Sequence, residues 1–214
     1  MNVFKPNVVI TGATGFLGSS LAAKVLHIGG SVIAITRNDK NGQRTRQAIL
    51  SAACGFGFTF STEDMQRVNV IDSNLVEPTI PGLCDILFEQ YTVWHCAAEM
   101  TYSASKLAQS LNTNLIGTQS LYQNFSRSDA CQRFYYVSTA YTAGFDVDIA
   151  QESLHLQPLL INTYQMSKWA AEMSLSVAAQ KSKLPVTLFR PSIICGHDKT
   201  GWDGGSKFGL YGVL

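Results

Sequence analysis

The segment Thr11-Gly-Ala-Thr-Gly-Phe-Leu-Gly18 constrains the fold of this chain more than any other feature. It stands between a compact apolar run at residues 8–11 and a stretch with apolar residues at helical spacing that ends near Ile28. Its three glycines permit a turn so tight that phosphates can press against the backbone. The helix N-terminus that follows presents N–H groups and the positive end of the helix dipole. This strand–turn–helix context predicts a pyrophosphate-binding turn, and a plain glycine-rich turn is the alternative.

Short apolar runs alternate with longer helical patterns along the rest of the chain. Strands are expected at residues 8–11, 32–36, 66–71, 91–95, 133–138 and 185–189, and helices at 15–28, 41–53, 103–125 and 162–181. Near-continuous apolar strands that alternate with helices indicate an α/β fold with a parallel sheet covered on both faces. Right-handed crossovers then favour a doubly wound Rossmann sheet with the strand order 3-2-1-4-5-6. The Gly/Phe-rich connection at residues 54–64 has no predicted role.

Composition excludes several other classes of protein. Apolar residues make up 46% of the 214 residues and charged residues 14%, which is typical of a chain with a buried core and not of a disordered one. A net charge of +1 gives no bulk electrostatic case for binding nucleic acid or an anionic membrane. We expect no signal peptide and no membrane span. The cysteines are scattered, without metal-ligand spacing, so we expect free thiols, no metal site and a cytoplasmic protein: Cys54, Cys84, Cys96, Cys131 and Cys195.

The end of the second expected strand indicates which nucleotide is bound. An acid usually stands there in NAD-specific sites, where it binds the ribose hydroxyls, but this chain has Arg37. A guanidinium matches a 2′-phosphate, so the sequence favours NADPH over NADH. A solvated charge at the end of a loop is the alternative for Arg37. Arg46, on the following helix, is a second candidate for a phosphate contact.

Tyr164 and Lys168 form a Y-x-x-x-K pair on an expected helix, where residues four apart share a face. A lysine ammonium beside a tyrosine is expected to lower the pKa of the phenol, so that it acts as a general acid near neutral pH. Taken alone, such a pair often occurs by chance on the surface of a helix. It gains weight because Ser138 and Thr139 stand at the carboxyl end of the fifth strand, where ligands collect in such sheets.

Six motifs occur in a fixed order along most of the chain: TGATGFLG at 11–18, HCAA at 95–98, NTNLIGT at 112–118, YVSTA at 136–140, YQMSK at 164–168 and RPSII at 190–194. In this combination the sequence resembles the extended short-chain dehydrogenase/reductase family, from its start to about residue 200. Within that family it is most similar to the thioester-reductase and fatty acyl-CoA-reductase branch, through residues 134–141, 167–172 and 190–201.

The resemblance implies a role for each matching residue. Tyr164 would donate a proton to the carbonyl oxygen, and Lys168 would hold the nicotinamide ribose. Thr139, rather than Ser138, would hydrogen-bond the substrate carbonyl, and Asn114 would support a proton-relay water near the lysine. The complete set of expected cofactor-binding residues is Gly12, Thr14, Gly15, Phe16, Leu17, Gly18, Arg37, Arg46, Asp72, Ala97, Ala98, Asn114, Ser138, Tyr164, Lys168, Pro191, Ser192 and Ile193. Asp72 would lie beside the adenine or simply form a turn, and the alanines and Ile193 have packing as their alternative.

The implied function is NADPH-dependent hydride transfer to a carbonyl, either an acyl thioester or the aldehyde derived from it. A sugar-nucleotide epimerase or dehydratase, which usually keeps tightly bound NAD, is one alternative, and a dinucleotide-binding fragment without turnover is another. Residues 1–195 would form the NAD(P)-binding domain, and residues 196–214 would begin a substrate-binding lobe that is mostly absent. Residues 208–214 are expected to begin a helix. The expected partner is a small or carrier-bound acyl substrate, and homodimer formation is left open.

Overall fold

A computed structural model describes residues 5–83 and 88–205 of the chain. The strands are β1 (Asn7–Thr11), β2 (Ser31–Thr36), β3 (Val68–Asp72), β4 (Tyr91–His95), β5 (Cys131–Val137) and β6 (Val186–Phe189). The helices are α1 (Phe16–His27), α2 (Gln43–Gly55), α3 (Thr62–Gln66), α4 (Leu107–Leu111), α5 (Gly117–Phe125) and α6 (Thr163–Gln180). Two short 3₁₀ turns, η2 (Ala104–Lys106) and η4 (Ala140–Ala143), and one π-helix, η3 (Asn112–Ile116), complete the described part.

The strands follow the order β3-β2-β1-β4-β5-β6, with parallel pairing, and this confirms the doubly wound Rossmann arrangement. The chain divides into two compact units. Unit 1 comprises residues 1–73, 81–97 and 193–214, and it contains the glycine turn. Unit 2 comprises residues 74–80 and 98–192, and it contains the Tyr164–Lys168 pair.

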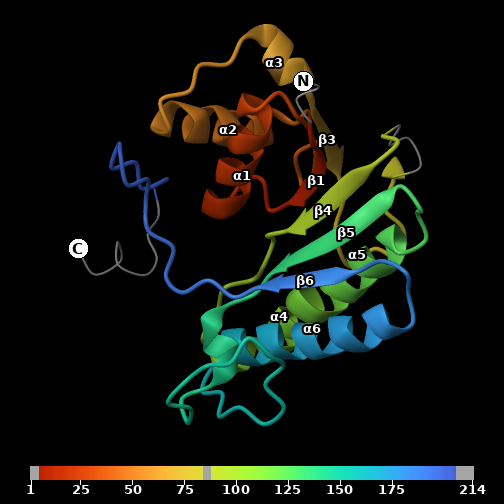
Figure 1. The fold of residues 1–214 in the computed structure, drawn as a ribbon, viewed down its shortest axis with the longest axis vertical. Coiled ribbons are helices and arrows are strands. Elements are labelled where there is room, and N and C mark those ends of the chain that lie inside the picture. Colours follow the sequence, from red (N-terminus) through yellow and green to blue (C-terminus); the bar gives the residue numbers. More distant parts are fainter. Residues whose placement is uncertain (1–4, 84–87, 206–214) are drawn as a thin grey trace. The chain divides into compact units, whose positions relative to one another are not determined.

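Unit 1 is built around β1, which pairs in parallel with both β2 and β4. Val9 lies opposite Ile33 on one side and Val93 on the other, and all three side chains are buried. Helices α1 and α2 lie side by side next to these strands (Figure 1). Each fully buried aliphatic side chain of this kind stabilises the folded state by about 1.5–3 kcal/mol. The apolar strands therefore hold the glycine turn between β1 and α1 on a rigid base.

The Gly/Phe-rich connection after α2 packs back onto α1. The Lys24 ammonium lies 4.6 Å from the ring centroid of Phe56 and 4.8 Å from that of Phe58, and His27 stacks on Phe58. The connection ends in the short helix α3, which Ser61 caps through a capping box. Gln66 closes this helix, so the predicted start of a strand there is wrong, and β3 begins two residues later.

Unit 2 contains the parallel pair of β5 and β6, in which Tyr136 lies opposite Leu188. Helices α4, α5 and α6 run beside these strands (Figure 1). Tyr122 of α5 is buried, and its hydroxyl donates to the Leu184 carbonyl over 2.7 Å. The helices thus bury their apolar faces, and the buried hydroxyl keeps a partner.

The single helix predicted over residues 103–125 is wrong in detail. The chain enters through a 3₁₀ turn at Ala104, and residues Asn112–Ile116 form a π-helix between α4 and α5. Thr118 donates its hydroxyl to the Asn114 carbonyl over 2.6 Å. Short π-helical segments often occur at functional sites. Hydrophobic periodicity does not reveal this one, because α4 and α5 on either side have only 5 and 9 residues, too few to show a shift in the pattern.

The other sequence expectations concern membranes, metals and thiols. No helix in residues 5–83 and 88–205 is long and apolar enough to cross a membrane. Within the same ranges, no group of three or more His, Cys, Asp or Glu side chains could hold a metal ion. Cys54, Cys96, Cys131 and Cys195 are free thiols. Cys84 and the helix expected at residues 208–214 lie outside the described residues.

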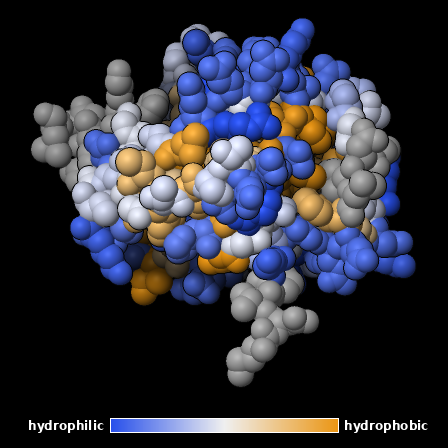
Figure 2. Space-filling model, turned by 90° about the horizontal axis from the view of Figure 1, so that it is seen from above, coloured by the Kyte–Doolittle hydropathy of each residue, from blue (hydrophilic) through white to orange (hydrophobic). Residues whose placement is uncertain are grey.

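Hydrophilic residues cover much of the face seen in Figure 2, with several hydrophobic patches among them. Exposed large hydrophobic side chains recur in the segment of unit 2 between η4 and α6. Phe145 is 58% exposed, Ile149 73%, Leu156 71% and Ile161 62%. Single exposed apolar side chains are normal on a protein surface, and these four lie within one connecting segment.

Candidate active site

The structure itself requires two of the three glycines in the turn of unit 1. Gly12 has a φ of +74°, and a Cβ there would lie 2.7 Å from the Ala97 nitrogen. A Cβ on Gly18 would overlap the Gly12 carbonyl. A Cβ on Gly15, by contrast, would meet the Gly12 oxygen at an ordinary 3.4 Å. The folded chain tolerates a side chain at Gly15, so a glycine there fits the close approach of a ligand from outside.

Gly15 also marks the open N-terminus of α1. It is the N-cap residue, and as a glycine it has no side chain to accept a hydrogen bond from the first turn of the helix. Gly15 and Thr14 are exposed, whereas Phe16 and Leu17 are half-buried. An uncapped helix N-terminus behind a glycine turn is the usual receptor for a phosphate. The turn therefore fits the pyrophosphate of a dinucleotide.

A hydrogen bond that the sequence interpretation missed supports the turn from below. The Thr11 hydroxyl lies 2.6 Å from Nδ1 of His95, and both side chains are fully buried. The same hydroxyl accepts a hydrogen bond from the Ala97 backbone nitrogen over 3.2 Å. These contacts fix Ala97 beside Gly12. The sequence signal for this hydrogen bond is that Thr11 and His95 are polar residues, each at the carboxyl end of an apolar strand.

The carboxyl end of β2 borders a cavity of about 380 Å³ lined by Asn38, Asp39, Lys40, Asn41, Gln43 and Asp72. Asp72 thus lies where the sequence places it, close to the residues that follow β2. Asp39 is buried and accepts hydrogen bonds from the Thr45 hydroxyl and backbone and from the Arg44 backbone. Burial alone would raise the pKa of Asp39, but these hydrogen bonds outweigh it and hold the pKa below its usual value. Asp39 was not predicted, and it fixes the start of α2.

The cations near this strand end differ in how they are engaged. Arg37 is exposed, directly after β2. Arg44, which the sequence interpretation missed, is also exposed, and its guanidinium donates to the Arg37 carbonyl over 2.6 Å. Arg46 donates to the carbonyls of Asn41 and Val68 over 3.0 and 3.1 Å. The guanidinium of Arg46 is thus bound to the backbone, whereas Arg37 is an exposed residue.

In unit 2, Tyr164 lies in the first turn of α6, which Asn162 caps. Tyr102 approaches the Tyr164 ring edge-on, with the ring centroids 6.3 Å apart. Burial, followed by the nearby Tyr102, raises the pKa of Tyr164 to about 12. This direction is opposite to the lowering that the sequence predicts. The phenol consequently keeps its proton at neutral pH, as a proton donor must.

Lys168 is almost completely buried, one helical turn after Tyr164. Its ammonium donates to the Val137 carbonyl over 2.6 Å and lies 4.3 Å from the centroid of the Tyr136 ring. A buried ammonium needs such partners, because desolvation otherwise disfavours the charged form. The contact ties α6 to the carboxyl end of β5.

Ser138 and Thr139 follow β5 directly, and both are buried. The Thr139 hydroxyl accepts a long hydrogen bond, 3.4 Å, from the Tyr141 backbone nitrogen. Among the described residues, the Ser138 hydroxyl has no hydrogen-bond partner. A buried hydroxyl left without a partner costs about 1–3 kcal/mol. Such an atom at a strand end fits a polar group of a bound ligand.

The Asn114 side chain is buried in the π-helix and is fully engaged by protein groups. Its amide nitrogen donates to the Glu99 carbonyl and to the Ser167 hydroxyl, both over 2.9 Å. Its oxygen accepts from the Glu99 nitrogen over 2.7 Å. The amide therefore fixes the segment that begins near Ala98, and the predicted relay water stays a prediction.

The remaining predicted residues lie after β6. The Pro191 carbonyl accepts a hydrogen bond from the Ala140 nitrogen over 2.9 Å, which places it beside the turn after Thr139. Ser192 is exposed, and Ile193 is 51% exposed. All three leave polar or apolar surface available to a ligand.

A parallel sheet of this order, with a glycine turn between its first strand and the following helix, defines the dinucleotide-binding class of Rossmann folds. Residues 10–214 match the family model described as Male sterility protein, and the chain belongs to this family. The match confirms the resemblance to the reductase branch of the extended short-chain dehydrogenases/reductases.

Two curated proteins illustrate the relationship. The chain is 29% identical over 240 residues to fatty acyl-CoA reductase 1 of Xenopus laevis, which covers 92% of this chain and 45% of the relative. It is 27% identical over 223 residues to the nonribosomal peptide synthetase cpsA of Aspergillus campestris, which covers 96% of this chain and 21% of the relative. The chain thus spans less than half the length of either protein.

Solved structures share the fold. The terminal R domain from the myxalamid PKS-NRPS biosynthetic pathway superposes with a TM-score of 0.76 at 22% identity, over 96% of this chain and 54% of that structure. A UDP-glucose 4-epimerase superposes with a TM-score of 0.67 at 24% identity, over 89% and 53% of the two chains. At such identities the likeness extends to the fold alone.

Proposed function

We propose that this chain is the nucleotide-binding and proton-donating part of an NADPH-dependent reductase of acyl thioesters or of the aldehydes derived from them. The observation that carries the proposal is the polar group of unit 2: a Tyr164 phenol that keeps its proton, a buried Lys168 one turn away, and the Thr139 hydroxyl after β5. The relatives that are fatty acyl-CoA reductases support the substrate class.

Unit 1 carries the residues for the nucleotide. The turn from Gly12 to Gly18 offers its backbone and an uncapped helix to the pyrophosphate. Asp72 and its cavity suit the adenosine. The exposed Arg37 favours a 2′-phosphate and hence NADPH. Arg46 remains a weaker candidate, because its guanidinium already donates to two backbone carbonyls.

The chemistry divides between cofactor and protein. The cofactor, when bound, supplies the hydride that reduces the carbonyl carbon. Negative charge then develops on the carbonyl oxygen, and hydroxyl donors stabilise it. Tyr164 delivers its proton to that oxygen, Thr139 hydrogen-bonds it, and Lys168 stabilises the phenolate that remains. Ser138 has an unsatisfied hydroxyl for a polar group of the cofactor or substrate.

An acyl substrate also suits the surface of unit 2. The segment between η4 and α6 exposes a run of large hydrophobic side chains close in sequence to Thr139 and Tyr164. Burial of an acyl chain against them would remove apolar surface from water. We propose that residues 196–214 begin a substrate-binding lobe.

The test is a turnover assay on the purified chain with NADPH or NADH, using fatty acyl-CoA and acyl-pantetheine thioesters. We expect loss of NADPH absorbance with a thioester and much less with NADH. Turnover of a nucleotide sugar alone would favour the epimerase alternative. Tight NADPH binding with no turnover of any carbonyl would favour a dinucleotide-binding module.

A further inference from the structure

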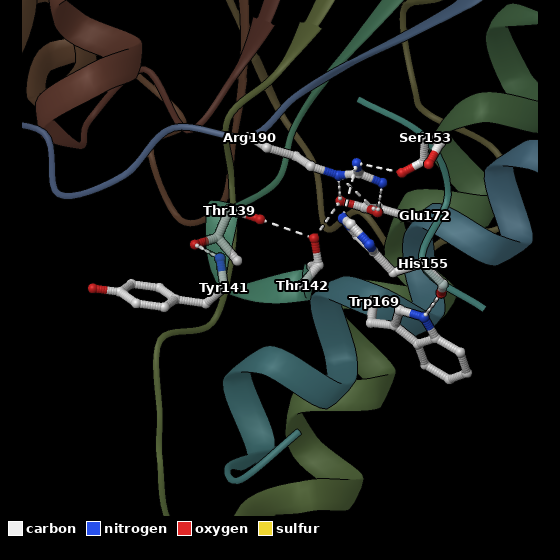
Figure 3. Close-up of polar contacts among 8 residues, drawn as sticks. All are labelled: Thr139, Tyr141, Thr142, Ser153, His155, Trp169, Glu172 and Arg190. Atoms are coloured by element: carbon white, nitrogen blue, oxygen red, sulfur yellow. Dashed lines mark hydrogen bonds and ion pairs between the residues drawn. The ribbon is translucent and has the colours of Figure 1, made fainter. Parts of the chain in front are cut away.

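In unit 2, a largely buried ion pair joins Glu172 and Arg190, whose side chains are 1% and 16% exposed. Glu172 lies on α6 one helical turn after Lys168, and it is fully buried. The Arg190 Nε atom lies 3.0 and 3.2 Å from the two carboxylate oxygens, and its Nη2 lies 2.7 Å from Oε2 (Figure 3). This bidentate geometry fixes both side chains.

The ion pair reaches the Thr139 turn through a single hydroxyl. The buried Thr142 side chain, in η4, places its Oγ1 3.2 Å from the Glu172 carboxylate and 2.9 Å from the Thr139 carbonyl (Figure 3). A threonine hydroxyl has one hydrogen, so these two acceptors share it. Tyr141, the other residue of this turn drawn in Figure 3, points away from the ion pair. Thr142 thus links α6 to the backbone of Thr139.

On its other side, Arg190 holds the segment that leads to Tyr164. Its Nη1 donates to the Ser153 carbonyl over 2.7 Å and lies 3.5 Å from Nε2 of His155. The Trp169 indole donates to the His155 carbonyl over 2.7 Å (Figure 3). Burial, followed by the adjacent Arg190, lowers the pKa of His155, which keeps the ring neutral beside the guanidinium.

Stability alone is a poor explanation for this pair. Desolvation of two charges offsets most of their attraction, and well-packed apolar residues often stabilise a core as much or more. A buried pair with fixed geometry does specify where the elements that carry it lie. Helix α6 carries both Tyr164 and Glu172. The groups that hydrogen-bond to Glu172, namely Thr142 and Arg190, therefore keep a fixed position relative to Tyr164.

We propose that Glu172, Arg190 and Thr142 are positioning residues that set the Thr139 hydroxyl relative to the Tyr164 phenol. The inference rests on the proposed function, in which both hydroxyls meet the same carbonyl oxygen. Lys168 provides a second tie from α6, to the Val137 carbonyl just before Ser138. Hydrogen bonds from Lys168 to Val137 and from Thr142 to Glu172 thus connect α6 to both ends of the short segment that carries Thr139.

The decisive variant is Thr142→Val, which keeps the size of the side chain and removes the shared hydroxyl. Displacement of Thr139 should lower kcat for thioester reduction about 10- to 100-fold, with the KM for NADPH within about twofold. Thr142→Ser, which keeps the hydroxyl, should restore most of kcat. Thr187→Val is the matched control, because Thr187 in β6 also has one partly buried hydrogen bond, from Arg133, and should leave kcat unchanged.

Hydrogen exchange gives a readout that does not depend on turnover. Thr142→Val should accelerate amide exchange in residues 139–143 and leave the middle of α6 protected, whereas Thr187→Val should not change residues 139–143. Unchanged exchange there, or equal kcat losses in both valine variants, overturns the positioning role. If the wild-type chain reduces no thioester, the proposed function fails, and the exchange result still decides whether Thr142 positions the Thr139 turn.

Discussion

The glycine turn of unit 1 and the Tyr164 region of unit 2 are built by opposite means. The turn works through side chains that are missing, since a Cβ on Gly12 or Gly18 would collide with backbone. The Tyr164 region works through polar side chains that are buried and held by hydrogen bonds, such as Lys168 and Asn114. A backbone receptor is built within a few residues, whereas a proton-donating group must be assembled from several elements.

The largest expected effect is on the proton donor. Tyr164→Phe removes the only atom of that ring that can donate a proton, so turnover should fall by about 10²–10⁴-fold. The affinity for NADPH should stay within a few-fold, because the glycine turn is unchanged. Steady-state kinetics and fluorescence titration with NADPH measure the two quantities. A near-normal rate would show that another group supplies the proton.

Substitutions in the glycine turn should change the affinity for NADPH and the stability of the fold. Gly18→Ala forces a Cβ against the Gly12 carbonyl, so we expect a loss of about 1–3 kcal/mol in the free energy of unfolding, together with weak NADPH binding. Gly15→Ala is the matched control for folding. Its Cβ fits, so the melting temperature should hold while NADPH affinity drops by at least about tenfold. Unaltered binding by Gly15→Ala would argue against a phosphate at this turn.

The choice of nucleotide should depend on the exposed guanidinium after β2. Arg37→Ala should weaken NADPH binding by about ten- to hundredfold, the value of one or two hydrogen bonds to a charged group, and leave NADH almost unaffected. Arg46→Ala should act mainly on stability, because Arg46 donates to backbone carbonyls. Titration of each variant with both nucleotides separates the two arginines. Equal weakening of both nucleotides by Arg37→Ala would remove it from 2′-phosphate recognition.

The smallest expected effect concerns Asp39, which fixes the start of α2. Its pKa is lowered in the folded state, so its contribution to stability is present at neutral pH and is lost as the pH falls through the folded pKa. Asp39→Asn should cost about 0.5–2 kcal/mol at neutral pH and flatten the acid limb of the stability curve. Denaturant unfolding between neutral and acidic pH measures both. If the stability of the variant falls with decreasing pH as steeply as that of the wild type, the pH dependence belongs to other carboxyl groups.

Local features of this protein could be predicted because their causes are local. The turn needs glycines within eight residues, and the apolar strands alternate with helices in an order that leaves few topologies. The residues that came together through distant parts of the chain were harder to foresee. Thr11 and His95 are 84 positions apart, and their hydrogen bond requires the two strands that they end to be neighbours in the sheet. Glu172 did carry a signal, since it stands four residues after Lys168 on the same helix face.

By itself the sequence determined the doubly wound sheet and the glycine turn, which follow from hydrophobic periodicity and backbone conformation. It also determined that Tyr164 and Lys168 share one helix face, which follows from their spacing of four residues. Only the tertiary structure decided that Arg46 is bound to backbone carbonyls and that Asn114 sits in a π-helix. It also decided that the pKa of Tyr164 is raised to about 12. These properties depend on desolvation and on which distant groups pack around each side chain, and neither is encoded in the spacing of residues along the chain.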